Sequence, residues 1–134
     1  VPEGSNYYPV TVLADVGQDM EITRNETFGP VVAMTPFDGS EAAAVTLAND
    51  TEYGLAAYVY TGDAAGKGQR VAMGIKAGQV GINCYSLFHA NVKCPWAGQK
   101  GSGHGYHSGY DGWRQFSAPK SLVYDKPVPA ASQA

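Results

Sequence analysis

The stretch that decides the fold covers residues 31–84 and reads VVAMTPFDGSEAAAVTLANDTEYGLAAYVYTGDAAGKGQRVAMGIKAGQVGINC. Apolar runs at residues 31–34, 54–60 and 79–84 predict three strands, and helical signals occupy the two segments between them. Strand, helix, strand, helix, strand at this spacing predicts two right-handed crossovers and a parallel sheet. Because helices cover both faces of such a sheet, we expect these strands to be buried.

Helix boundaries are also readable from single residues. Ser40 is suited to cap the first helix, and Asp63 can cap the second. Lys76 fits the last turn of that second helix, and Gly78 fits a left-handed residue just beyond it.

Outside the central stretch the elements are less regular. Residues 7–16 predict an edge strand, because Pro9 lacks the amide that an inner strand needs. Residues 84–112 are rich in glycine and aromatic residues and predict a long functional loop. A short helix is expected at 111–116, and a last strand at 119–125.

Composition sets limits on function. The 134 residues carry a formal net charge of −3, which gives no electrostatic reason to expect nucleic-acid or acidic-membrane binding. Charged residues make up 16%, against about 25% in an average domain, so we expect much of the surface to be covered by more chain or a second subunit. We see no apolar stretch long enough to cross a bilayer and no secretory leader, and expect a cytoplasmic protein.

Two pairs of residues are candidates for binding small molecules. Glu26 and Phe28 stand just before a strand, and a carboxylate there could accept hydrogen bonds from both hydroxyls of a ribose while the ring packs beside it. The alternative is a solvated glutamate beside a core phenylalanine. Phe88 and Trp96 could line an apolar substrate pocket, or could pack the long loop onto the sheet.

Other motifs carry weaker signals. Residues 99–105 superficially resemble a phosphate-binding loop but lack its order of residues, and a flexible packing loop is favoured. Metal-binding residue types occur without the spacing of a zinc site, so no metal is expected; they are Cys84, His89, Cys94, His104 and His107. We expect both cysteines to be buried, inert thiols.

Taken together, the segments resemble the C-terminal part of the aldehyde dehydrogenase superfamily. The resemblance rests on several motifs in the family's order: YYPVTVLADV with Met20, NETFGPVV, AND-TEYGLAAYVYTGD, RVAMGIKAGQVGINCY, PWAGQKGSGHGYHSG and PKSLV. It implies an α/β fold, a three-layer sandwich with a mostly parallel sheet, of which this chain is a C-terminal fragment. Residues 1–117 would complete the catalytic domain, 118–126 would form the oligomerisation strand, and 127–134 would be a disordered tail.

The resemblance also implies roles for individual residues. Glu26 and Phe28 would bind NAD or NADP at the nicotinamide ribose, and Phe88 and Trp96 would line the aldehyde pocket. The family's cysteine nucleophile and general base both lie upstream, so no catalytic residue is expected in this chain. Departures from the family pattern gather near the presumed pocket: Asn25, Ala97, Tyr106 and His107.

The function implied is part of an NAD(P)-dependent aldehyde dehydrogenase. Such an enzyme oxidises a small aldehyde to a carboxylic acid through a thiohemiacetal and a thioester on the upstream cysteine. A homodimer or homotetramer joined through the C-terminal strand is expected. One alternative is a catalytically empty relative that serves as an assembly or binding module, and another is an independent metal-binding domain.

Overall fold

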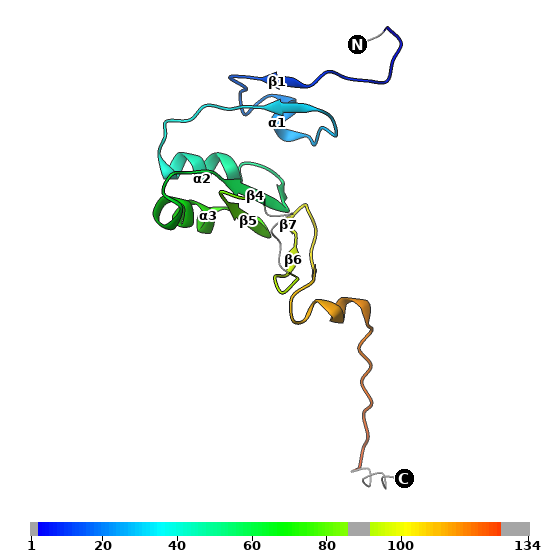
Figure 1. Ribbon diagram of the computed structural model, residues 1–134. Coiled ribbons are helices and arrows are strands. Elements are labelled where there is room, and N and C mark those ends of the chain that lie inside the picture. The colour runs from blue at the N-terminus through cyan, green and yellow to red at the C-terminus, as the bar shows by residue number, and fades with distance from the viewer. Residues whose placement is uncertain (1–2, 86–91, 127–134) are drawn as a thin grey trace.

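The structure of the protein is a computed structural model that describes residues 3–85 and 92–126. Its first three elements are β1 (Thr11–Leu13), helix α1 (Glu21–Arg24) and β2 (Val31–Ala33). β1 and β2 pair in parallel, with Thr11 opposite Val31, and form the unit at the top of Figure 1. The strand predicted at 7–16 is therefore limited to its central residues.

The next unit is a parallel crossover. Helix α2 (Glu41–Asn49) leads to β4 (Ala56–Val59), which continues through the π-helical turn η1 (Ala64–Gly68) and helix α3 (Gln69–Gly74) to β5 (Gln79–Ile82). β4 and β5 pair in parallel. α3 packs against both strands and α2 packs against α3 (Figure 1). The α/β class and this crossover are confirmed.

One prediction about the sheet is wrong. β2 does not pair with β4 or β5 but with β1, so the strands predicted to share one parallel sheet belong to two separate parallel pairs. The N–H of Thr11 donates to Pro30 O at 2.9 Å, and the N–H of Met34 donates to Leu13 O at 2.8 Å. These bonds extend the β1–β2 ladder at both ends, after which α2 carries the chain to the second pair.

Both predicted helix caps are confirmed. Ser40 Oγ accepts a hydrogen bond from the N–H of Ala43 at 3.1 Å. The Asp63 carboxylate accepts from the N–H groups of Gly66 and Lys67, at 2.9 and 3.0 Å. These bonds satisfy amides that have no partner within the first turn.

The predicted end of the second helix is wrong. α3 ends at Gly74, so Lys76 lies outside it, and Gly78 is not among the residues with positive φ. Gly78 is instead needed for space, because a Cβ there would overlap the carbonyl oxygen of Ala97. The glycine therefore permits two backbones to approach closely.

The predicted long loop contributes strands to two short antiparallel ladders. β3 (Tyr53–Gly54) pairs with β7 (Gln99–Lys100), and β6 (Trp96–Ala97) pairs with β8 (Tyr106–His107). The short helix predicted at 111–116 is present as the 3₁₀ helix η2 (Gly112–Phe116).

The strand predicted at 119–125 is not formed in this structure. Residues 118–124 are extended and lead away from the other elements (Figure 1), and no strand among the described residues lies beside them to accept their hydrogen bonds. The tail at 127–134 lies outside the described residues.

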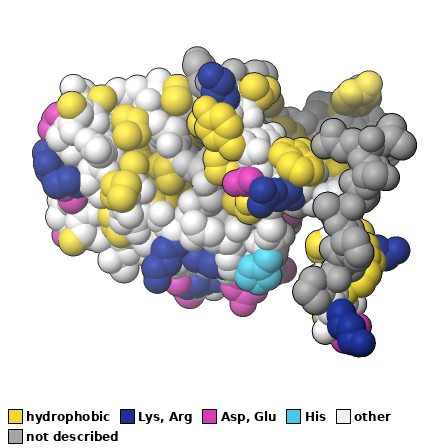
Figure 2. All heavy atoms as spheres, turned by 90° about the horizontal axis from the view of Figure 1, so that it is seen from below, with side chains coloured by type: hydrophobic (Ala, Val, Ile, Leu, Met, Phe, Trp, Pro, Cys, Tyr) yellow, Lys and Arg dark blue, Asp and Glu magenta, His cyan; other side chains and the backbone are white. Residues whose placement is uncertain are grey.

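Little of the chain is buried. Val16, 4% exposed, is the buried hydrophobic residue of the described chain, and β4 is half-buried along its whole length. The accessible surface is 10607 Å², whereas a folded monomer of this mass exposes about 6,700 Å². Figure 2 shows hydrophobic side chains spread over one face among charged groups. The expectation of buried strands is wrong for the chain alone, because it supplies only part of their cover.

Candidate functional site

The loop that holds Glu26 connects α1 to β2 and is shaped by local hydrogen bonds. The N–H of Gly29 donates to Thr27 O at 2.9 Å, and the N–H of Val31 donates to Gly29 O at 2.8 Å. Each bond closes a three-residue turn, a common feature at strand ends. At the other end of the loop, the N–H of Asn25 donates to Glu21 O at 2.9 Å. Glu26 therefore stands between two fixed segments.

Arg24, the last residue of α1, is held by three separate groups. Its Nη1 and Nη2 donate to the two carboxylate oxygens of Asp50 at 2.9 and 3.0 Å. Its Nε donates to Gln18 O at 2.7 Å, and Nη1 also reaches Asp50 O at 3.2 Å. The hydrogen bond from Arg24 lowers the pKa of Asp50 below its ordinary value of 3.8. The pair joins the β1–β2 unit to the C-terminal end of α2.

A cavity of about 510 Å³ lies where these two units meet. Arg24, Asn25 and Glu26 line one side, and residues 51, 53–57, 75–77 and 101–102 contribute to the rest. Glu26 is exposed, and no described residue donates a hydrogen bond to its carboxylate. Both of its oxygens can therefore accept hydrogen bonds from a ligand hydroxyl pair.

Phe28 does not share that cavity. Its ring is 95% exposed, and it is not among the residues that line the space beside Glu26. The alternative of a core phenylalanine is wrong for the described chain, because no described side chain covers the ring. Its exposure leaves one large apolar surface two residues from the Glu26 carboxylate.

The loop at residues 99–105 is anchored to the C-terminal end of α2. Lys100 Nζ donates to the carbonyl oxygens of Asn49 and Thr51, each at 3.1 Å. Ser102 Oγ accepts from the N–H of Gly54 at 3.0 Å. A lysine at these carbonyls satisfies acceptors that the helix leaves open. The packing role predicted for this loop is confirmed, although these contacts fix it instead of leaving it flexible.

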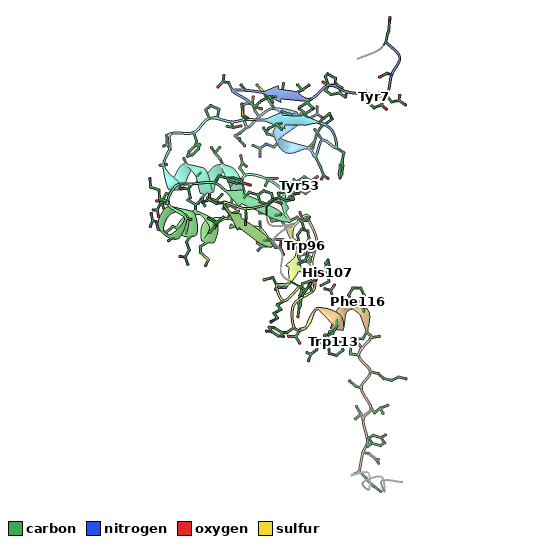
Figure 3. All side chains as sticks on the ribbon, in the orientation of Figure 1. Tyr7, Tyr53, Trp96, His107, Trp113 and Phe116 are labelled. Atoms are coloured by element: carbon green, nitrogen blue, oxygen red, sulfur yellow. The ribbon has the colours of Figure 1, made fainter. Side chains whose placement is uncertain are left out.

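Trp96 lies apart from Glu26. It is half-buried in β6, opposite His107 in β8, and the two ring centroids are 6.5 Å apart with planes tilted by 30°. Figure 3 shows this pair below the β4–β5 unit. Trp96 does not line the cavity beside Glu26. Phe88, the other residue predicted for the substrate pocket, lies outside the described residues.

The cysteines differ from expectation. Cys84 is half-buried and Cys94 is exposed, so the prediction of two buried thiols is wrong. Cys84 follows the half-buried β5, and Cys94 lies in the short turn before β6. Within residues 3–85 and 92–126, no three histidine, cysteine or acidic side chains gather to hold a metal ion. Over the same ranges no helix has the length and hydrophobicity needed to span a membrane.

The contacts that Arg24, Asp50 and Lys100 make around the end of α2 were not predicted from the sequence. An arginine and an aspartate 26 positions apart leave no periodic signal, and only the fold brings them together.

Comparisons with known proteins agree with the observed fold. The model of the aldehyde dehydrogenase family matches residues 1–122. A putative succinate-semialdehyde dehydrogenase [NADP(+)] of Mycolicibacterium smegmatis is 40% identical over 121 residues, which cover 90% of this chain and 23% of the relative. A betaine aldehyde dehydrogenase of Brucella anthropi is 43% identical over 115 residues, covering 86% of this chain and 23% of the relative.

A solved structure supports the same assignment. A betaine aldehyde dehydrogenase variant from Staphylococcus aureus, in complex with NAD+, superimposes with a TM-score of 0.74 at 36% identity. The match covers 92% of this chain and 24% of that one. The chain thus spans about a quarter of the length of the relatives it matches. On these matches, the chain belongs to the aldehyde dehydrogenase family.

Proposed function

We propose that this chain is the C-terminal quarter of an NAD(P)-dependent aldehyde dehydrogenase that oxidises a small aldehyde to a carboxylic acid. One observation carries the proposal beyond the family match. Glu26 stands on a locally fixed loop, at the wall of a cavity of about 510 Å³, with both carboxylate oxygens open. This pair of hydrogen-bond acceptors suits the two hydroxyls of a ribose diol.

In this proposal Glu26 orients the coenzyme and Phe28 covers one side of its sugar. The bound NAD or NADP supplies a hydride acceptor. Glu26 would accept hydrogen bonds from the ribose hydroxyls beside the nicotinamide, which limits the rotation of the ring. Phe28 offers an exposed ring for packing against the sugar. The nucleophilic cysteine and the general base would come from parts of the protein outside this sequence.

Trp96 is proposed to line the aldehyde pocket and to influence substrate choice. The names of two relatives point to substrates of opposite charge, betaine aldehyde and succinate semialdehyde. The face of an indole ring attracts a quaternary ammonium group, which only the first of these carries. Trp96 therefore favours betaine aldehyde. Replacing Trp96 with alanine should raise the KM for betaine aldehyde more than the KM for succinate semialdehyde.

Residues 118–126 are proposed to join subunits into a homodimer or homotetramer. Residues 118–124 are extended and have no strand beside them in the part of the chain that the structure describes, and three of their side chains are 62–91% exposed: Leu122, Val123 and Tyr124. An extended segment of this kind can add to the sheet edge of another subunit. Deleting residues 118–134 from the full-length protein should lower its mass in light scattering, and an unchanged mass would contradict this role.

The experiment that tests the function is turnover by the full-length protein. We expect reduction of NAD or NADP with a small aldehyde, and expect Glu26→Gln to weaken coenzyme binding and slow hydride transfer about tenfold or more. Glu3→Gln, which removes an exposed carboxylate outside the Glu26 loop, is the control and should leave turnover unchanged. A folded oligomer without turnover on any aldehyde would instead favour the catalytically empty assembly module.

A further inference from the structure

We propose that Asp50, at the C-terminal end of α2, is a positioning residue for Glu26 and acts through Arg24. The inference rests on the proposed coenzyme role of Glu26 and adds a second site that controls it. Asp50 itself touches neither coenzyme nor substrate in this account. Its role is to hold the end of α1 from which the Glu26 loop starts.

Asp50 is connected to the Glu26 loop through its hydrogen bonds with Arg24. The Arg24 guanidinium and the Asp50 carboxylate form two parallel hydrogen bonds, 2.9 and 3.0 Å long. This two-pronged arrangement fixes the orientation of the guanidinium as well as its distance. Only Asn25 separates Arg24 from Glu26, so a change in the position of Arg24 is transmitted to Glu26 through one residue.

Further hydrogen bonds connect the Arg24–Asp50 pair and its neighbour to other segments of the chain. Arg24 Nε donates to Gln18 O at 2.7 Å, which ties the pair to the turn before α1. Asn49, the neighbour of Asp50, donates through Nδ2 to Gly74 O at 2.9 Å and accepts from the N–H of Lys76 at 2.7 Å. The end of α2 is therefore bound to both the β1–β2 unit and the end of α3.

Position, and not stability, is the effect expected of this pair. Both side chains are 45% exposed, and ion pairs so open to water add little to the free energy of folding. A displacement of the Glu26 loop by a fraction of an ångström, however, would misplace the group that orients the coenzyme. Reaction rates are sensitive to such displacements.

The chain contains a matched control. Glu41 and Arg70 form a second two-pronged pair, with hydrogen bonds of 2.9 and 2.6 Å. This pair joins the opposite end of α2 to α3 and is also exposed. It has the same chemistry as the Arg24–Asp50 pair but no connection to the Glu26 loop.

The test uses the full-length protein and steady-state kinetics with NAD or NADP. We expect Asp50→Asn to raise the KM for coenzyme several-fold and lower kcat about tenfold, while the KM for aldehyde stays unchanged. Arg24→Lys keeps the charge but loses one of the two hydrogen bonds to Asp50. Its KM for coenzyme and its kcat should lie between those of wild type and Asp50→Asn. Glu41→Gln should leave all three constants unchanged.

A double variant separates positioning from general damage. If Asp50 acts through Glu26, adding Asp50→Asn to Glu26→Gln should cause no further loss. Losses that multiply in the double variant would show an independent structural role and overturn the proposal. If Glu26→Gln itself leaves coenzyme kinetics unchanged, the proposed function fails before the role of Asp50 is reached.

A second measurement does not depend on activity. Amide hydrogen exchange at residues 25–29 of the full-length protein should be faster in Asp50→Asn than in wild type, and unchanged in Glu41→Gln. Equal exchange rates in wild type and Asp50→Asn would overturn the proposal even if the enzyme were active.

Discussion

Two units of this molecule share one topology but differ in how they are held. Both the β1–α1–β2 unit and the β4–η1–α3–β5 unit are parallel strand pairs with a helical crossover (Figure 1). In the second unit, Asp63 caps the crossover and α3 packs against both strands. In the first, α1 is a single turn, and its N-cap residue, Met20, makes no side-chain capping hydrogen bond.

The two units also differ in how far their strand residues are exposed to solvent. Val12 of β1 is 58% exposed and Val32 of β2 is 54% exposed, whereas the residues of β4 are half-buried. The second unit is thus covered partly by its own crossover, while the first leaves apolar strand residues uncovered. Since the relatives are about four times as long, we expect the rest of such a polypeptide to cover the first unit.

The largest expected effect is a loss of stability caused by a substitution in the second unit. In Gly78→Ala, the new Cβ would overlap Ala97 O, and a backbone atom cannot turn aside as a side chain can. We expect the full-length protein to lose at least about 3 kcal/mol of stability, measured by denaturant unfolding. Gly62→Ala is the control, since a Cβ there meets nothing within 4 Å, and its stability should match wild type. Equal stability of the two variants would contradict this packing.

The next effect tests the cover of the first unit. Val12→Asp places a carboxylate on a strand face that is open in this chain. If the remaining polypeptide covers that face, the full-length protein should lose about 2 kcal/mol or more, because the charge would be buried without a partner. Unfolding curves of the wild-type and variant full-length proteins check this, and an unaffected variant would show that the face stays open.

A smaller effect is expected at the cap of η1. Asp63→Ala removes the acceptor for two backbone amides and should lower the melting temperature of the full-length protein by a few degrees. Asp63→Asn keeps one acceptor oxygen and should recover most of that loss. An unchanged melting temperature in Asp63→Ala would show that the cap does not stabilise the second unit.

The smallest effect concerns the ion pair that joins the two units. The Arg24 hydrogen bond lowers the pKa of Asp50 in the folded state, so folding favours the ionised carboxylate. The contribution of the ion pair to the free energy of folding is therefore complete above the ordinary pKa of 3.8, and it is lost as the pH falls below that value. The small stability difference between wild type and Asp50→Asn, present at pH 7, should disappear under acid. A difference that persists there would contradict the ion pair.

Much of the second unit could be predicted from the sequence because its determinants are local. Ser40 and Asp63 cap helices within three or four residues of themselves, and the apolar run at 54–60 contains β4. The ends of helices were harder to predict from the sequence. Gly78 was expected to end a helix, but its actual role depends on Ala97, which lies 19 positions away.

The candidate site was predictable only in part. Glu26 was identified by its place before a strand and by the family resemblance, and the structure puts it at a cavity wall. Arg24 and Asp50 were not identified, because their pairing depends on how α1 and α2 meet. Trp96 was identified, but its position opposite His107 follows from a two-residue ladder that has no sequence periodicity.

The most direct test of the central claim is a crystal structure of the full-length protein with NAD+ bound. We expect both Glu26 carboxylate oxygens to lie within hydrogen-bonding distance, about 2.7 Å, of the hydroxyls on the ribose next to the nicotinamide. A bound coenzyme whose ribose is held by other residues, with Glu26 directed into solvent, would contradict it.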